Sequence, residues 1–202
     1  MVDFTIISFF VIITFIHSIF FLRWKRNGIL ISLLLLSTVT EITRTFSKQY
    51  IFVLIYTYFI IIFWLKFLFL VFNKKIFLPI AIPFSFFCFT MIFVADNLLN
   101  AAFYMFTVGS IIYITSFIVL SFNVLKIENF NLFLSNEFLL IISPIFFFIG
   151  LSFLFAFGSK SLFKEKIFGN IYLYNLINYS VNLIYYSLIN LYIYKEYKRN
   201  HV

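Results

Sequence analysis

The chain has 202 residues, of which 64% are apolar and 11% carry a charge, and its mean hydropathy is +1.09. A soluble domain is about 45–50% apolar and about 25% charged, so this composition excludes the ordinary soluble class. The formal net charge is +8, but the basic residues stand between apolar stretches and not on a basic helix or domain. We therefore expect no nucleic-acid partner.

The chain is predicted to be all-α, a polytopic membrane helix bundle with seven transmembrane helices. About 20 helical residues cross the ~30 Å hydrocarbon core of a bilayer, and seven stretches of about this length follow one another. The connections leave no room for a soluble domain, so residues 1–202 form a single transmembrane helical domain. The expected spans are residues 4–22, 28–46, 50–72, 76–94, 98–122, 138–157 and 170–194.

The Lys and Arg residues predict the orientation of the bundle, because positive residues favour the cytoplasmic side. With seven spans and the N-terminus outside, ten basic residues fall on the inner side and five on the outer side. This two-to-one bias favours seven spans in an N-out/C-in, multi-pass membrane protein, with the lipid bilayer as its surroundings. The five outer residues are Arg44, Lys48, Lys160, Lys164 and Lys166.

The last span carries a polar stripe. At 100° per residue, its polar side chains share about a third of the helix circumference. Lipid cannot satisfy their hydrogen bonds, so the stripe faces other helices or water. Two interpretations stay open: asparagines that join helices, worth ~0.6–2 kcal/mol each, or an outward-facing cavity lined by Asn175, Asn178 and Asn182. The stripe consists of Asn175, Asn178, Tyr179, Asn182, Tyr186 and Asn190.

Glu41 and Arg44 are the sharpest pair of residues in the second span. They are three residues apart, so they share one face of a helix. An ionisable residue inside a membrane costs at least ~2.5–3.5 kcal/mol on insertion scales and is a functional candidate. The alternative is a simple pair at the helix end, with Arg44 reaching the outer surface. The candidate ligand-binding residues, at a pocket mouth built from spans two, three, five and seven, are Glu41, Arg44, Tyr56, Asn175, Asn178 and Asn182.

Several chemistries find no support in the sequence. Cys88 is the one cysteine, which excludes an intrachain disulfide and a thiolate metal cluster. His17 is the one histidine within a span, and we expect it to be an interhelical hydrogen-bond partner near the inner side. No catalytic or nucleotide-binding fingerprint occurs. We therefore predict no catalytic residue, no metal and no cofactor.

Two segments carry a resemblance to known proteins. The second span reads Leu33-Leu34-Leu35-Leu36-Ser37-Thr38-Val39-Thr40-Glu41-Ile42, and the sixth opens with Ser143-Pro144-Ile145-Phe146-Phe147, followed by Gly150. With the polar opening of the last span, this layout resembles small bacterial seven-helix membrane proteins and the seven-helix input regions associated with sensor histidine kinases. The resemblance implies a sensing module whose output passes through another protein. By residue it extends to Glu41 and Pro144, and to no catalytic role.

The leading hypothesis is a non-enzymatic, seven-helix sensing and signalling module of the bacterial inner membrane. It would relay a ligand or a membrane state to a membrane or cytoplasmic signalling partner by shifting the packing of the second and seventh spans. The alternative is a small transporter or permease subunit that uses Glu41 as a proton or cation site. A third hypothesis is a lipid-modifying membrane enzyme, which needs a second acid or a metal ligand near Glu41.

Overall fold

The protein is a bundle of antiparallel α-helices. The computed structural model describes residues 6–47, 50–128, 130–156, 166–167, 169 and 171–201. A short 3-10 helix η1 (Phe130–Leu132) and two paired strands, β1 (Lys166–Ile167) and β2 (Ile171–Tyr172), lie in the connections. The α-helices of the described part are α1 (Ile6–Phe21), α2 (Trp24–Ser47), α3 (Tyr50–Val71), α4 (Phe77–Val94), α5 (Leu98–Lys126), α6 (Asn136–Ala156) and α7 (Leu173–His201).

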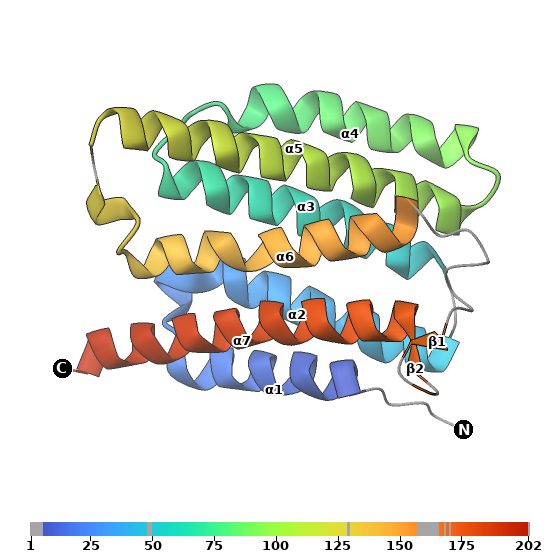
Figure 1. Cartoon of the computed structure of the whole chain (residues 1–202), viewed down its shortest axis with the longest axis horizontal. Helices are drawn as coiled ribbons and strands as arrows, with labels where there is room; N and C mark the ends of the chain where they lie inside the picture. The colour runs from blue at the N-terminus through green and yellow to red at the C-terminus, as the bar shows by residue number, and fades with distance from the viewer. Residues whose placement is uncertain are drawn as a thin grey trace.

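The helices run side by side, alternately up and down, and their connections gather at two ends (Figure 1). At the left end in Figure 1 lie the C-terminus and the connections α1–α2, α3–α4 and α5–α6. At the right end α2 and α6 finish and α3 and α7 begin. We call the left end the basic end, because many Lys and Arg residues lie there, and the right end the cavity end, because a cavity lies there.

Four helices have the length and composition needed to cross a bilayer. They are α3, α4, α5 and residues Asn136–Phe155 of α6, with mean hydropathies between 2.0 and 2.6. α1 is also apolar but shorter, with 16 residues, and it packs between α2 and α7. These helices indicate an integral membrane protein, and the prediction of an all-α helical bundle is confirmed.

The helix boundaries differ from the predicted spans mainly where polar residues flank the apolar core. α5 continues past residue 122 to Lys126, and α7 continues past residue 194 to His201, because neither flank contains a helix breaker. The last helix was predicted to begin at residue 170. It begins instead at Leu173, since Ile171 and Tyr172 pair as a strand with Lys166 and Ile167.

Two glycines let neighbouring helices approach closely. A Cβ atom added to Gly150 of α6 would overlap the side chain of Val181 on α7, and α6 and α7 form the most extensive helix contact in the bundle. A Cβ atom at Gly109 of α5 would lie 2.8 Å from Ile61 Cγ1 of α3. Small residues at such positions are a common way to pack membrane helices.

A layer of buried aromatic residues closes the middle of the bundle. Trp64 of α3 donates its indole N–H to the Tyr185 hydroxyl of α7 at 3.1 Å. The Tyr113 hydroxyl of α5 donates to the Ile141 carbonyl of α6 at 2.7 Å. All three rings are buried, so their polar atoms are satisfied inside the protein. This layer separates the two ends of the molecule.

Candidate functional site

A cavity of about 390 Å³ lies at the cavity end, among six of the seven α-helices described. Its lining comes from the early parts of α1, α3, α5 and α7 and from the late parts of α2 and α6, which meet at this end. Tyr50, at the start of α3, lines the cavity and is 54% exposed, so the cavity reaches the surface there.

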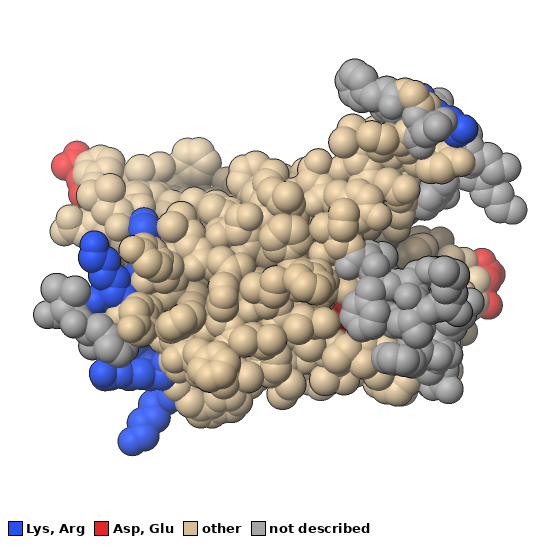
Figure 2. Space-filling model, turned by 90° about the horizontal axis from the view of Figure 1, so that it is seen from below, with Lys and Arg blue, Asp and Glu red and all other residues tan. Residues whose placement is uncertain are grey.

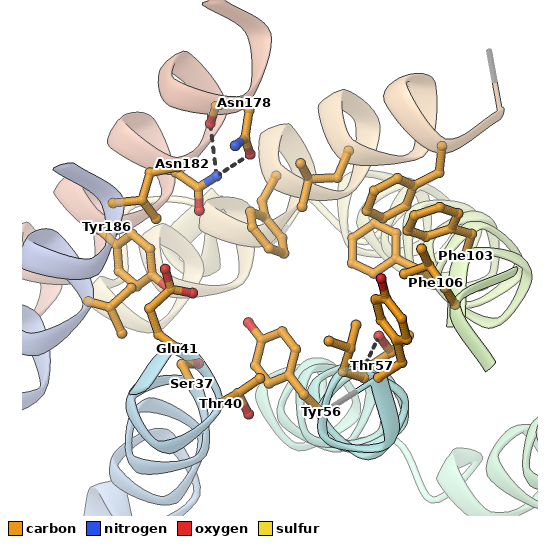
Figure 3. Close-up of a pocket in the computed structure, with 18 of the residues that line it drawn as sticks. Ser37, Thr40, Glu41, Tyr56, Thr57, Phe103, Phe106, Asn178, Asn182 and Tyr186 are labelled. Carbon is orange, nitrogen blue, oxygen red and sulfur yellow. Dashed lines mark hydrogen bonds between the residues drawn. The ribbon is translucent and has the colours of Figure 1, made fainter. Parts of the chain in front are cut away.

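One side of the cavity is polar. We call it the polar wall, and it contains the single carboxylate among the described lining residues, that of Glu41. Figure 3 shows this carboxylate turned into the cavity, with the rings of Tyr186 and Tyr56 near it. The hydroxyl of Ser8, a fully buried residue of α1, donates to Glu41 Oε1 at 2.8 Å. The polar wall consists of Ser37, Thr40 and Glu41 of α2 and Asn178, Asn182 and Tyr186 of α7.

Three hydroxyls and one amide in and beside the polar wall donate within their own helices. Ser37, Thr40 and, on α3, Thr57 each donate their hydroxyl to the backbone carbonyl four residues earlier, at 2.8–2.9 Å. Asn182 donates its amide to the carbonyl oxygen of Asn178 at 2.8 Å and to its side-chain oxygen at 3.0 Å. A hydroxyl has one donor and two acceptor lone pairs. These hydroxyls therefore present acceptors to the cavity.

The opposite side is apolar, and we call it the aromatic wall: Phe103 and Phe106 of α5 and Phe147 and Phe155 of α6. Phe103 and Phe155 are stacked with ring centroids 4.3 Å apart. Phe106 meets the rings of Phe155 and Phe147 edge-on, at 5.2 and 5.8 Å. Such interlocked rings form a fixed apolar surface.

The structure brings four of the six predicted site residues together. Glu41, Tyr56, Asn178 and Asn182 all line the cavity, and they come from three helices that were expected to share a pocket mouth. Asn175 is not among the lining residues. The side chain of Arg44 lies outside the described residues, so its pairing with Glu41 stays a prediction. α1 and α6 also contribute to the cavity, which the sequence had not indicated.

The polar stripe of α7 has two different environments along its length. Near the cavity end Asn178 and Asn182 line the cavity, whereas further along Asn190 joins α7 to α1. Its amide donates to Thr14 Oγ1 at 2.7 Å, and its side-chain oxygen lies 3.0 Å from His17 Nδ1. The stripe therefore contains residues that line a cavity and a residue that joins two helices. His17 is the interhelical hydrogen-bond partner of Asn190.

A second polar cluster, which we call the charged ring, lies at the opposite end of the same helices. It consists of Arg26 at the start of α2, Glu137 at the start of α6, and Glu196 and Arg199 near the end of α7. Arg26 lies 2.9 Å from Glu137 and 3.3 Å from Glu196, and Arg199 lies 3.2 Å from Glu137 and 2.7 Å from Glu196. Each arginine therefore contacts both glutamates.

The charged ring is half buried and has polar support. The Glu196 side chain is 0% exposed, whereas those of Arg26 and Arg199 are 51% and 41% exposed. Tyr192, one turn before Glu196, donates its hydroxyl to Asn27 Oδ1 at 2.7 Å. Asn27 has non-helical angles (φ −113°, ψ 17°) that interrupt α2 next to Arg26.

The charged ring was missed in the sequence, where Arg26 and Arg199 indicate only the orientation of the bundle. A signal was present: Glu196 and Arg199 are three residues apart on one helix, at an end where most charges are basic. The basic residues of this end are Arg23, Lys25, Arg26, Lys74, Lys75, Lys126, Lys195, Lys198 and Arg199. Figure 2 shows most of the visible Lys and Arg at the left-hand end and a further basic group at the upper right, on either side of a broad central surface that is nearly all uncharged.

No group of three or more His, Cys, Asp or Glu residues that could hold a metal ion occurs in the described part of the chain. No family model, curated protein or solved structure matches the chain. Its class is therefore defined by its own architecture: a helical membrane protein with a half-polar cavity near one end and a charged ring at the other.

Proposed function

We propose that this protein is a non-enzymatic sensing module of the bacterial inner membrane that binds a small molecule in the cavity and relays its presence to a partner protein. The observation that carries the proposal is that the three helices that form the charged ring, α2, α6 and α7, also line the cavity. A small shift of these helices at the cavity end changes the geometry of the ring.

The proposal includes seven spans with the N-terminus outside and the C-terminus in the cytoplasm. The gathering of basic residues at one end supports this orientation, because positive residues are retained on the cytoplasmic side. α1, α2 and α7 run alongside the four long apolar helices in the same bundle. The cavity then faces the outer side, and the charged ring faces the cytoplasm, where a signalling partner can contact it.

The relay we propose is a rigid-body shift of packed helices by about 1–2 Å, which is typical of signalling transitions. α7 carries Asn178 and Asn182 in the cavity and Glu196 and Arg199 in the ring, so it connects the two sites directly. The arginines are half exposed and each contacts two glutamates. The ring can therefore exchange partners without leaving Glu196 unpaired, and so it avoids the large cost of an unpaired buried charge.

The transporter hypothesis is the second candidate, and it is favoured by a carboxylate in a membrane cavity. Between the cavity and the basic end, however, the buried and hydrogen-bonded pair of Trp64 on α3 and Tyr185 on α7 lies across the bundle. A cavity that ends on such a layer fits binding better than passage. If Glu41 is a transport site, Glu41→Gln abolishes substrate flux in proteoliposomes and leaves the fold intact.

Covalent occupation of the cavity tests the relay without knowledge of the ligand. Cys88 is buried on α4 and outside the cavity lining, so Cys88→Ala provides a cysteine-free background. In it, Asn178→Cys is modified with benzyl methanethiosulfonate, which places a benzyl group in the cavity. We expect hydrogen–deuterium exchange of residues 24–30 and 192–199, which surround the charged ring, to increase after modification.

The matched control is Val94→Cys in the same background, since Val94 is 72% exposed at the same end of the bundle and does not line the cavity. Its modification should leave exchange at the charged ring unchanged. Equal exchange before and after modification of Asn178→Cys, with complete labelling shown by mass spectrometry, contradicts the relay.

A further inference from the structure

We infer that Lys66 of α3 is the central residue of a binding site for the headgroup of an anionic phospholipid, in the leaflet at the basic end. The site is separate from the cavity and from the charged ring, and it gives the protein a lipid partner beyond the proposed function. Lys66 is the one charged residue of the four long apolar helices that does not lie at a helix end. Lys126 is the last residue of α5, and Glu137 is the second residue of α6.

Lys66 lies on the face of α3 that the rest of the bundle leaves uncovered. α3 packs against α2, α4, α5 and α6. After its first residue, the large apolar side chains that stay exposed fall, at 100° per residue, within an arc of about 100° that includes Lys66. They are Ile51, Ile55, Phe59 and Leu70, which are 39–58% exposed. The side chain of Lys66 is exposed as well. In a bilayer this stripe faces lipid, and Lys66 is its charged member.

The depth of Lys66 matches the level of the lipid phosphates. It is five residues before the end of α3, so its Cα atom lies about 7–8 Å inside that end. A lysine stem can stay on apolar surface while its ammonium group reaches the headgroups. The chain then turns back tightly: Asn73 has φ 52°, and the N–H of Lys74 donates to the Phe69 carbonyl at 2.8 Å. Lys74 and Lys75 therefore lie at the same end of α3.

The charge around Lys66 favours a partner that is negative overall. Lys66 has no hydrogen-bond or salt-bridge partner among the described residues. α3, α4 and their connection contain three lysines, Lys66, Lys74 and Lys75, and no Asp or Glu. An ammonium group has three donors, and phosphate oxygens accept them. Phosphatidylglycerol offers a phosphate without a cation of its own, whereas the choline of phosphatidylcholine adds a positive charge that the lysines repel.

The same stripe offers a surface to the acyl chains. A headgroup held at Lys66 directs its chains along α3 toward the cavity end. Phe59 is seven residues deeper than Lys66, or about 10–11 Å, and Ile55 is about 16–17 Å deeper. Half of the ~30 Å hydrocarbon core is about 15 Å, so Phe59 lies beside the middle of a chain and Ile55 near its end. The stripe therefore contacts both the charged and the apolar part of one lipid.

The test measures which lipid lies beside Phe59. Trp24→Phe removes an exposed tryptophan, Trp64 is buried, and Phe59→Trp places a fluorescent reporter on the stripe. The full chain is reconstituted in phosphatidylcholine vesicles with rising fractions of phosphatidylglycerol or phosphatidylcholine that is brominated in the middle of its chains. Bromine quenches tryptophan at close range, so the two quenching curves give the relative affinity of the two lipids for the stripe. We expect phosphatidylglycerol to bind at least about fivefold more tightly.

Three charge variants of this reporter chain locate the preference. Lys66→Gln should lower the preference for phosphatidylglycerol about fivefold, the contribution of one lysine near the headgroups. Lys66→Arg keeps the charge and should keep the preference. Lys195→Gln is the matched control, because it removes an exposed lysine at the same end on α7, and it should leave the preference unchanged. Removing a charge from an apolar span favours insertion, so Lys66→Gln should fold.

The inference is overturned if both brominated lipids quench the reporter equally in the chain with Lys66. It is also overturned if Lys66→Gln and Lys195→Gln lower the preference by the same factor, because the basic end then attracts anionic lipid without a site at Lys66. Either result leaves the relay standing, since the relay is tested at the cavity and the charged ring.

Discussion

At the scale of single residues, Glu41 is the side chain whose position most needs explanation. A carboxylate among apolar helices is costly unless it is hydrogen-bonded. Ser8 meets part of this need from a neighbouring helix, and it is fully buried. A serine in the first apolar span, unremarkable in the sequence, is thus a supporting residue of the cavity.

Ser8→Ala should lower the free energy of unfolding by about 1.5–3 kcal/mol, because it removes a hydrogen bond to a charged group. Ser18→Ala is the matched control: Ser18 is equally buried on the same helix, but its hydroxyl donates to the Phe15 carbonyl. Its loss should cost about 0.5–1.5 kcal/mol. The free energy of unfolding of each variant is measured in mixed detergent micelles. If the two substitutions lower it equally, the result contradicts the role of Ser8 in supporting Glu41.

The charged ring gives a second prediction at this scale. Glu196→Gln leaves two arginines sharing Glu137 and should destabilise the protein by about 1–3 kcal/mol, less than a fully buried pair because the arginines are half exposed. Glu137→Gln is the comparison. Since Glu137 is 31% exposed, its loss should cost less than about 1 kcal/mol. A larger loss for Glu137→Gln, measured by the same unfolding assay, contradicts this ranking.

At the scale of helices, the contact between α6 and α7 depends on Gly150. Gly150→Ala forces a methyl group into Val181 and should cost about 1–3 kcal/mol, as overpacking does. Val181→Ala in the same chain should restore much of the loss by making room. Gly28→Ala is the control, because its added Cβ meets nothing closer than 3.7 Å. Additive effects of the two substitutions in a double-mutant cycle contradict the contact.

The sequence predicted the helices well because bilayer thickness requires long apolar stretches, and each such stretch became a helix. It left open whether the polar stripe of α7 joins helices or lines a cavity, and it noted only that Asn178 and Glu41 lie at overlapping levels; both residues line the cavity. It did not predict the aromatic wall. With 34 phenylalanines in the chain, composition cannot tell which four meet at one place.

The charged ring was missed for a related reason. Arg26 and Glu137 are 111 residues apart, and their contact depends on how α2, α6 and α7 pack, which no local pattern records. Apolar length predicts the elements, whereas the polar contacts between them arise only from the tertiary arrangement.

At the scale of the whole molecule, the polar sites are segregated along the bundle axis. The cavity and the charged ring lie at opposite ends, and the aromatic layer with Trp64 and Tyr185 separates them. This arrangement suits a protein that receives a molecule on one side of a membrane and reports on the other. Everything in the proposed function depends on the cavity being reachable from the outer side.

Thiol accessibility tests that claim most directly. In the Cys88→Ala background, spheroplasts carrying Asn178→Cys or Ile189→Cys are treated with a membrane-impermeant cationic methanethiosulfonate. Ile189 lies three turns further along α7 and is fully buried. We predict rapid modification of Asn178→Cys and none of Ile189→Cys. Equal rates at the two positions, or modification of Asn178→Cys only in inverted vesicles, would contradict an outward-facing cavity.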